Sequence, residues 1–350
     1  SLGNISGNRI PNSEITPFEK NETEFGMDLR LFDNKLSIDA TYYDNETVGD
    51  IVGVSASATS GYNSALANLG EISNKGIELL VKGTIMQTAD FAWNATLNYT
   101  NNESKVVATN DTGGNISMDE PRSRNLRVTH IVGEKYGALY GSSFVRDTNG
   151  AIVHEMVNGI PIPKVGPRKI LGFGVAPTQL GIGSNFRYKD FDAGFLIEGK
   201  MGGQIYSGSN AYLKRNGHHK STVPAGGREG GWVPTGVMEG GGAVTTSIPA
   251  AQQEDYYRRS YLIAEQDVID SDYMRLRQLS IGYTIPSDKL QGTFIDKATV
   301  SLIGRNLFFL SNNVDNVDPE SAYNASNSAG LEYFALPVPR TIGLNVNLKF

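Results

Sequence analysis

The sequence predicts an all-β protein, an antiparallel β-barrel whose strands cross a membrane. Three observations support this fold class: apolar and polar residues alternate over many segments, these segments are long, and short and long connections alternate between them. Successive side chains of a strand point to opposite faces, so alternation gives each strand one apolar and one polar face. Such a strand separates two different solvents, as the wall of a membrane barrel does.

The alternating segments recur along the whole chain. Their apolar positions are, in order, Phe25, Met27, Leu29 and Leu31; Leu36, Ile38, Ala40 and Tyr42; Ile77, Leu79, Val81 and Ile85; Phe91, Trp93, Ala95, Leu97 and Tyr99; Phe191, Ala193, Phe195 and Ile197; Leu279, Ile281, Tyr283 and Ile285; and Ile342, Leu344, Val346, Leu348 and Phe350. Mostly glycine and polar residues occupy the positions between them. Two further strands are expected near 178–189 and 296–310, which brings the total to about nine.

The lengths of the connections separate a barrel from an antiparallel sandwich, which also alternates. Short turns are expected at 33–34, 88–90, 189–190 and 286–296, and long connections at 51–71, 109–177, 205–271 and 312–337. Strict alternation of short and long connections is typical of an up-and-down barrel, which has short periplasmic turns and long outward loops. A Greek-key sandwich has no reason to sort its connections in this way, so the barrel is favoured.

Strand length and aromatic placement agree with a membrane wall. The segments 35–50, 72–87 and 91–107 run about 15 residues, whereas a tilted membrane strand needs only about 9–11, so these strands are expected to project beyond the bilayer. Aromatic residues gather near strand ends, where an interfacial girdle is expected. They are Tyr42, Tyr43, Trp93, Tyr99, Phe186, Tyr188, Phe191, Tyr283 and Phe350.

Composition excludes several other classes. No apolar run approaches about 18 residues, the length that indicates a membrane helix. The sequence contains no cysteine, which excludes disulfides, thiolate metal sites and thiol nucleophiles. A net charge of −6 argues against a nucleic-acid-binding protein. Residues 1–4 lack the features of a signal peptide, so either a leader has been removed or the chain begins inside a longer one.

No catalytic motif is found in the sequence, and an enzyme is not expected. His154 and Glu155 begin like a zinc-protease helix, but Asn158 stands where the second histidine ligand would be needed. His218 and His219 could bind a metal. Adjacent histidines in a loop rich in glycine and lysine are more often simply solvated.

No cofactor is expected either, with calcium left open as an alternative. Asp315, Asp318 and Glu320 offer hard oxygen ligands of the kind that Ca²⁺ takes. The segment lacks the glycine of an EF-type loop, and Pro319 favours a rigid turn instead.

Several segments resemble the SusC/RagA-type TonB-dependent transporters of Bacteroidetes. The closest match is 68–79, Asn-Leu-Gly-Glu-Ile-Ser-Asn-Lys-Gly-Ile-Glu-Leu. Others are 22–29, 272–277 (Asp-Tyr-Met-Arg-Leu-Arg) with the turn at 283–286, 304–308 (Gly-Arg-Asn-Leu-Phe), 318–320 (Asp-Pro-Glu) and 340–350. The matches keep the family's order over essentially the whole chain.

The resemblance implies a barrel of about 22 strands filled by an N-terminal plug. About nine strands would leave an open edge in lipid. We therefore expect this chain to be the C-terminal portion of one such barrel, with the plug domain, the TonB box and the first strands outside it. The terminal aromatic Phe350 is implied to serve barrel assembly.

The resemblance also implies a function and partners. The function would be TonB-dependent import of a nutrient across the bacterial outer membrane, with an oligosaccharide as the first candidate and an oligopeptide as the second. A SusD-like lipoprotein would cover the outward loops, TonB would act through the missing plug, and the short turns would face the periplasm. Lipid and lipopolysaccharide would surround the barrel, and no nucleic acid is expected as a partner.

Two residue sets are candidates for contact with the nutrient. Charges and amides on the polar strand faces suit a hydrated lumen, although general barrel polarity explains each alone: Asp28, Arg30, Asp39, Glu78, Lys82, Asn98, Arg187, Asp192, Glu198 and Lys200. Aromatic residues of the long loops could stack on sugar rings or hold peptide side chains, although packing within the loops is their more frequent role. They are Tyr136, Tyr140, Tyr206, Tyr212, Trp232, Tyr256, Tyr257 and Tyr261.

Two other functional classes remain open on the sequence alone. One is a passive porin or an adhesin barrel without a plug. The other, less favoured, is a soluble β-sandwich that binds glycans at the cell surface.

Overall fold

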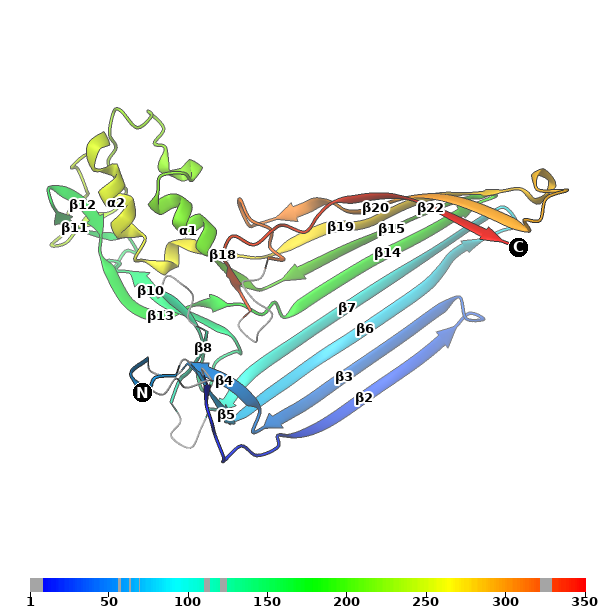
Figure 1. Cartoon of the computed structure of the whole chain (residues 1–350), viewed down its shortest axis with the longest axis horizontal. Helices are drawn as coiled ribbons and strands as arrows, with labels where there is room; N and C mark the ends of the chain where they lie inside the picture. The colour runs from blue at the N-terminus through cyan, green and yellow to red at the C-terminus, as the bar shows by residue number, and fades with distance from the viewer. Residues whose placement is uncertain are drawn as a thin grey trace, which may run out of the picture.

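The computed structural model describes residues 9–55, 58–62, 64–68, 70–109, 114–119, 125–321 and 329–350. Its main element is one nine-stranded antiparallel sheet in which each strand pairs with the next sheet strand along the chain (Figure 1). The strands are, in order, β2 (Glu19–Leu31), β3 (Leu36–Val48), β6 (Glu71–Gln87), β7 (Phe91–Ala108), β14 (Thr178–Tyr188), β15 (Phe191–Met201), β19 (Tyr273–Ile285), β20 (Lys297–Asn312) and β22 (Thr341–Lys349). This up-and-down order confirms the predicted barrel topology, and the sandwich alternative is wrong.

The register of the sheet aligns apolar side chains into continuous rows. One row of paired residues crosses from β2 to β20 and is apolar throughout: Leu29, Ile38, Val81, Leu97, Ile182, Ile197, Leu276 and Phe308. Side chains on this face are not covered by other elements, and Phe25 and Leu344 are 69% and 71% exposed. An uncovered apolar face of this extent is expected for a surface that meets lipid.

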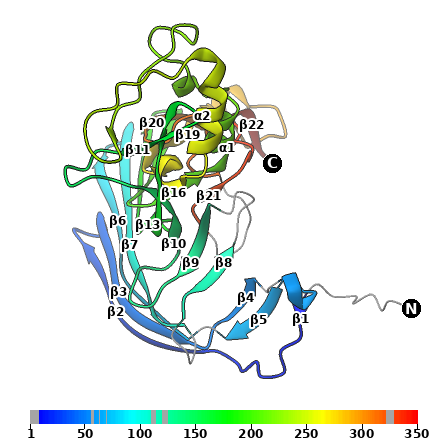
Figure 2. The same cartoon turned by 90° about the vertical axis from the view of Figure 1, so that its left-hand side faces the viewer.

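The opposite face of the sheet is polar. A neighbouring row of paired residues contains Arg30, Ser37, Lys82, Thr96, Gly183, Leu196, Gln278, Arg305 and Thr341. Leu196 in this row and Leu80, which pairs with Asp39, are apolar exceptions on this face. Figure 2, viewed from the end of the long connections, shows that the sheet curves in cross-section.

A bulge interrupts the predicted alternation in β6 without moving Ile85 off the apolar face. The register shifts between Thr84 and Met86, so Met86 pairs with Trp93 and takes the next position in the apolar rows. Ile85 lies at the irregularity and keeps its predicted face, because its Cδ1 would lie 3.5 Å from a Cβ at Gly83, which pairs with Leu36. A bulge of this kind adds one residue to one strand and changes the face of those that follow.

Aromatic side chains line up at the short-turn end of the sheet. Phe91 pairs with Tyr188, Tyr188 with Phe191, and Phe191 with Tyr283, so four rings lie in one register row. The Phe191 and Tyr283 rings have their centroids 4.8 Å apart. This row matches one edge of the expected interfacial girdle.

The strands continue past the apolar rows at the other end. β6 and β7 contain 17 and 18 residues. On the outward face, Lys75 Nζ lies 2.8 Å from Asp44 Oδ2, immediately beyond Tyr42 and Ile77. The change from apolar rows to an ion pair marks the place where the outward face leaves an apolar environment.

The long connections between sheet strands lie together at this end, and the short turns lie at the other (Figure 1). We call the described parts of 49–70, 109–177, 202–272 and 313–340 the loop region. Its strands are β1 (Arg9–Ile10, preceding β2), β4 (Ile51–Ser55), β5 (Ser64–Asn68), β8 (Ile116–Asp119), β9 (Leu126–His130), β10 (Ala138–Phe144), β11 (Val153–Val157), β12 (Ile160–Pro163), β13 (Val165–Phe173), β16 (Gln204–Ser207), β17 (Val237–Met238), β18 (Val268–Asp270) and β21 (Leu331–Glu332). The helices are α1 (Gly208–Arg215) and α2 (Gln253–Ser260), and 3₁₀ segments cover Ala58–Ser60, Lys220–Thr222, Ala250–Gln252 and Ala264–Asp267, with Ser287–Lys289 at a short turn.

The buried apolar core lies in the loop region rather than in the sheet. Its main cluster contains Leu126, Val128, Leu139, Tyr206, Ala211, Tyr261, Ala264 and Leu331. These residues come from strands and helices far apart in the sequence, so their burial fixes the loops to one another. In the described part of the chain, no helix has the length and apolar character needed to cross a membrane.

Candidate functional site

The ten polar candidates all lie on the polar face of the sheet. Each one is adjacent in its strand to a residue of the apolar face and therefore points to the opposite side of the sheet. The structure brings Asn98, Glu198 and Lys200 together around one hollow of about 280 Å³. Asp28 and Arg30 form an exposed ion pair of 3.3 Å on the first strand.

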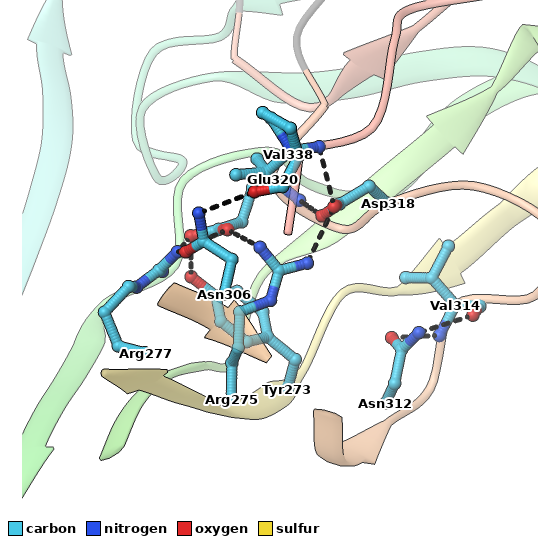
Figure 3. Close-up of polar contacts among 10 residues, drawn as sticks. Tyr273, Arg275, Arg277, Asn306, Asn312, Val314, Asp318, Glu320 and Val338 are labelled. Carbon is cyan, nitrogen blue, oxygen red and sulfur yellow. Dashed lines mark hydrogen bonds and ion pairs between the residues drawn. The ribbon is translucent and has the colours of Figure 1, made fainter. Parts of the chain in front are cut away.

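An ion-pair network joins β19 to the connection 313–340 at this hollow (Figure 3). Glu320 accepts a hydrogen bond from Tyr273 Oη at 2.7 Å and from Arg277 Nη1 at 3.0 Å. Arg277 Nε also lies 2.6 Å from Glu198 Oε2, and Arg275 Nη1 pairs with Glu320 Oε2. The network therefore fastens an outer connection to the polar face of the sheet.

The second arm of the network is buried. Arg275 Nη2 lies 2.7 Å from Asp318 Oδ2, and the guanidinium carbon lies 3.9 Å from the centroid of the Phe309 ring. Asp318 also accepts backbone N–H groups from Glu320 at 3.0 Å and from Val338 at 3.2 Å. The Asp-Pro-Glu segment is thus a rigid turn held by its own carboxylate and by an arginine of the sheet.

The network also sets the charge state of Glu320. Burial on its own raises the pKa of this carboxyl, but the hydrogen bonds from Arg277 and Tyr273 and the charges of Arg277 and Arg275 outweigh burial and hold the pKa below its ordinary value. Glu320 therefore stays ionised and bound to its arginines at neutral pH.

The three calcium candidates bind protein cations in this structure. Asp318 and Glu320 face Arg275 and Arg277, and Asp315 Oδ2 lies 2.6 Å from Lys220 Nζ. Across the described ranges, no group of three His, Asp or Glu side chains is arranged to hold a metal ion. Arginine side chains thus neutralise Asp318 and Glu320, and Lys220 neutralises Asp315.

The histidine candidates are parts of the loop packing. His154 is buried, with Nδ1 3.2 Å from the carbonyl oxygen of Ile152, and burial lowers the pKa of its ring. His219 is buried as well, and its Nδ1 accepts the backbone N–H of Ser221 at 3.1 Å. His218 remains exposed.

A second polar cluster crosses β3, β6 and β7 on the same face. Tyr43 Oη donates to Asn102 Oδ1 at 2.9 Å, and Asn102 Nδ2 donates to Ser104 Oγ at 2.9 Å. Ser104 Oγ then donates to Asn74 Oδ1 at 2.5 Å, and Asn74 Nδ2 to Asn45 Oδ1 at 3.2 Å. The cluster is a continuous chain of amides and hydroxyls.

Gly76, within the segment that resembles the transporter signature, makes room for this chain. A Cβ at Gly76 would overlap the Tyr43 ring and would lie 2.7 Å from the carbonyl oxygen of Asn101. Only glycine lets the tyrosine cross β6 to reach Asn102, so the signature glycine has a packing cause.

Of the eight loop aromatics, three are buried and five are partly exposed. Tyr206, Tyr256 and Tyr261 are buried and pack the loop region. Tyr136 is half-buried, its ring centroid 4.2 Å from that of His130, and Tyr140 is half-buried in β10. The partly exposed remainder is Tyr212, Trp232 and Tyr257, of which Tyr212 and Tyr257 line a cavity of about 660 Å³.

Sequence reasoning missed the central residues of the network. Tyr273, Arg275 and Arg277 alternate on one strand, which places them on one face, although in the sequence they contribute only to the family resemblance. Two arginines at i and i+2 on a polar strand face, with an acidic turn later in the chain, could have indicated ion pairing.

A single up-and-down sheet with apolar outward rows, a charged opposite face and long connections at one end defines part of a membrane β-barrel. The chain belongs to the TonB-dependent receptor-like β-barrel family, whose model matches residues 1–307.

Curated relatives of the chain are named as TonB-dependent receptors, SusC among them, as the resemblance implied. The chain is 27% identical to TonB-dependent receptor P3 of Formosa agariphila, over 94% of this chain and 34% of that protein. It is 25% identical to TonB-dependent receptor SusC of Bacteroides thetaiotaomicron, over 55% of this chain and 20% of that protein. The chain thus spans about a third of the length of the first relative.

Solved structures of the RagAB peptide transporter share the fold. One superposes with a TM-score of 0.67 and 16% identity, over 95% of this chain and 35% of that one. The closed-closed state of the RagAB peptide importer gives a TM-score of 0.68 and 17% identity, over 95% and 35% of the two chains.

Proposed function

We propose that the protein containing this chain imports a nutrient across the bacterial outer membrane in a TonB-dependent manner. The observation that carries the proposal is the sheet itself, which has apolar rows on one face and polar and charged residues on the other. A polar solute crosses a bilayer only through a wet interior inside an apolar belt. Family membership supports the same class of activity. No catalytic step and no cofactor are part of the proposal.

In the proposed orientation the polar face lines the lumen, the short turns face the periplasm and the loop region faces the exterior. Lipid and lipopolysaccharide contact the apolar rows. An unpaired strand edge in hydrocarbon costs several kcal/mol for each exposed backbone group, by order of magnitude, so further strands complete the barrel. TonB then acts through a plug inside that barrel.

An oligosaccharide is the first candidate nutrient, and an oligopeptide is the second. Partly exposed rings at Tyr212, Trp232 and Tyr257, together with the amide and hydroxyl chain of the polar face, favour a hydroxylated ligand. The likeness to the RagAB peptide importer, which concerns the fold, keeps the peptide as the second candidate.

A SusD-like lipoprotein is the proposed outer partner, seated on the loop region. The ion-pair network supports this role, because it holds the connection 313–340 in place beside the polar face. A partner can dock on outer loops with little loss of entropy when those loops are already ordered.

Uptake by cells tests the import proposal. Cells that lack the gene should lose accumulation of fluorescently labelled oligosaccharides, and a plasmid copy should restore it. A protonophore should abolish uptake, because TonB draws on the inner-membrane gradient. Uptake that resists the protonophore would indicate a passive porin instead, and surface binding without accumulation would indicate an adhesin.

Purification tests the partner. Affinity capture of the full-length protein from detergent-solubilised outer membranes should retain one lipoprotein in equal amount. Capture of the barrel alone under gentle detergent conditions would contradict the proposed SusD-like partner.

A further inference from the structure

One well-formed cavity lies in the loop region and not on the polar face of the sheet. It has a volume of about 660 Å³, and its lining comes from α1, the segment 216–228, Ala250, α2 and Phe334. The two helices lie side by side, as both views show (Figures 1 and 2). The volume is within the range of about 300–1,000 Å³ typical of small-molecule sites.

Two tyrosine rings form fixed walls of this cavity. The Tyr257 ring stacks on Trp232 with centroids 6.4 Å apart and meets the edge of Tyr256 at 5.2 Å. The Tyr212 ring packs against Tyr261, with centroids 5.4 Å apart. Because buried neighbours hold each ring from behind, a ligand meets flat surfaces that lose little entropy on binding.

Phe334 extends the second wall. Its ring centroid lies 5.8 Å from that of Tyr212, and the side chain is 63% exposed. It comes from the connection 313–340, about 120 residues after α1 in the sequence. An exposed phenylalanine beside a braced tyrosine offers apolar contact area at the mouth of the cavity.

The polar groups of the cavity include both donors and acceptors. Gln253 is 5% exposed, and its Nε2 donates to the carbonyl oxygen of Arg228 at 2.9 Å, which leaves Oε1 as an acceptor. Arg228 Nη2 donates to the carbonyl oxygen of Gly217 and, at 3.0 Å, to Thr222 Oγ1, so its guanidinium is fixed with further N–H groups to offer. Gln253 and Tyr257 are four residues apart on α2, which places them on one helix face.

The charges of the lining cancel. Arg228 and Glu254 are its charged members with fixed charges, one of each sign. An anionic ligand needs a surplus of cations and a cationic ligand a surplus of carboxylates, so neither is favoured. Flat walls with mixed donors and acceptors between them suit an uncharged ring that carries hydroxyl groups.

We propose that the cavity between α1, α2 and Phe334 binds a pyranose ring of an uncharged oligosaccharide. Tyr257, Tyr212 and Phe334 contact the ring faces, while Arg228, Gln253 and Glu254 bind the hydroxyl groups. Glycan binding at the cavity does not depend on the proposed import function. Only the role of the site in the cell rests on that function: it would hold a neutral glycan before the glycan reaches the lumen.

The experiment measures binding and its location on the full-length protein in detergent. Calorimetric titrations use cellohexaose, xylohexaose, laminarihexaose, mannohexaose and maltohexaose as neutral glycans, hexagalacturonate as an anionic glycan and hexa-alanine as a peptide. Fluorine NMR of protein labelled with 5-fluorotryptophan reports the site, because Trp232 stacks directly behind Tyr257. The Trp232→Phe variant assigns that resonance.

We expect at least one neutral hexaose to bind with saturation and to shift the Trp232 resonance. Phe334→Ala should weaken that binding tenfold or more, and its exposure makes misfolding no explanation for the loss. Tyr257→Leu, which keeps an apolar side chain against Trp232 but removes the flat ring, should have a similar effect. Tyr62→Ala, in the connection 49–70 away from the cavity, is the control and should bind as the unmodified protein does.

Several outcomes overturn the proposal. They are tighter binding of hexagalacturonate, binding of hexa-alanine alone, no binding of any neutral hexaose, or full-strength binding in Phe334→Ala and Tyr257→Leu. Protonophore-sensitive uptake without glycan binding at the cavity would contradict the proposed binding site and support the import function. Glycan binding at the cavity without such uptake would support the binding site and contradict the import function.

Discussion

Arg275 and Asp318 form an ion pair that is shielded from water, with Nη2 and Oδ2 2.7 Å apart and side chains 3% and 4% exposed. Arg275 belongs to the sheet and Asp318 to an outer connection, so the pair joins wall and loop. Each charge is costly to desolvate, and the pair is stable only because both partners are present with their other hydrogen bonds satisfied.

Replacing Arg275 with methionine should therefore cost about 3–5 kcal/mol, because it leaves Asp318 buried without its counter-charge. The measurement is the free energy of unfolding in detergent, together with the rate of proteolysis within 313–340, which should rise. Arg30→Met is the matched control, since Arg30 pairs with Asp28 at an exposed position. That change should cost about 0–1 kcal/mol. Equal losses in both variants would mean that the network does not fasten the connection.

The assignment of the two sheet faces can be tested on a single strand. Leu97 belongs to the apolar row across the sheet, and Asn98 beside it faces the polar hollow. Leu97→Arg should cost about 2–4 kcal/mol if the row lies at the bilayer midplane, because it places a guanidinium in hydrocarbon. Asn98→Arg should cost little. The measurement is the unfolding free energy of protein folded into lipid vesicles, and a reversed order would exchange the two faces.

The C-terminal aromatic has a partner of its own. The rings of Phe350 and Phe294 stack with centroids 5.6 Å apart and an interplanar angle of 16° at the short-turn end. Phe294→Ala should lower the surface level of folded barrel, as Phe350→Ala should, because the stack is worth about 0.5–1.5 kcal/mol and orients the last residue.

The control for Phe294 is Phe32, which is also exposed at a short turn and has no ring partner among the described aromatics. Folded and unfolded forms are separated by electrophoresis without heating. A Phe32→Ala variant that loses as much folded barrel as Phe294→Ala would show that ring contact is not what matters.

Much of the sheet could be predicted because its signal is local. A side chain's face depends only on its position along the strand, so the faces of Leu29, Leu97 and Leu344 follow from alternation. The connection lengths then supply the pairing order. The departures are also local, since the bulge at Thr84–Met86 adds Met86 to the apolar face, and the sequence period gives no sign of it.

The candidate site could be predicted only in part, since its contacts depend on the fold of long connections. Arg275 and Asp318 are 43 residues apart, and nothing in the spacing selects Asp318 as the partner. Tyr206 at the end of β16 and Tyr212 on α1 are close in the sequence, yet the first is buried and the second lines a cavity. Their roles depend on which distant segment packs on α1, which no local pattern contains.

The loop region should respond to acid through His130. This residue is fully buried against Tyr136, both ring nitrogens lack a hydrogen-bond partner, and burial lowers the pKa of the imidazole to about 4. In the unfolded chain the pKa returns to about 6.5, so the unfolded state binds more protons between these values. Stability is therefore complete above about pH 6.5 and falls as the pH drops towards 4, by roughly 2 kcal/mol at pH 5.

His130→Phe should remove this dependence, since phenylalanine fills a similar space beside Tyr136 and cannot take up a proton. It should also remove two buried ring nitrogens that have no hydrogen-bond partner, so the free energy of unfolding at pH 7.5 should be equal or higher. Urea unfolding of the loop region at pH 7.5 and pH 5, followed by proteolysis, measures the difference between the two proteins. Subtracting the variant from the unmodified protein cancels the titration of carboxylates that both share. His218→Phe, at an exposed histidine, is the control and should keep the dependence of the unmodified protein. Parallel losses of stability in the unmodified protein and in His130→Phe would place the acid response elsewhere in the chain.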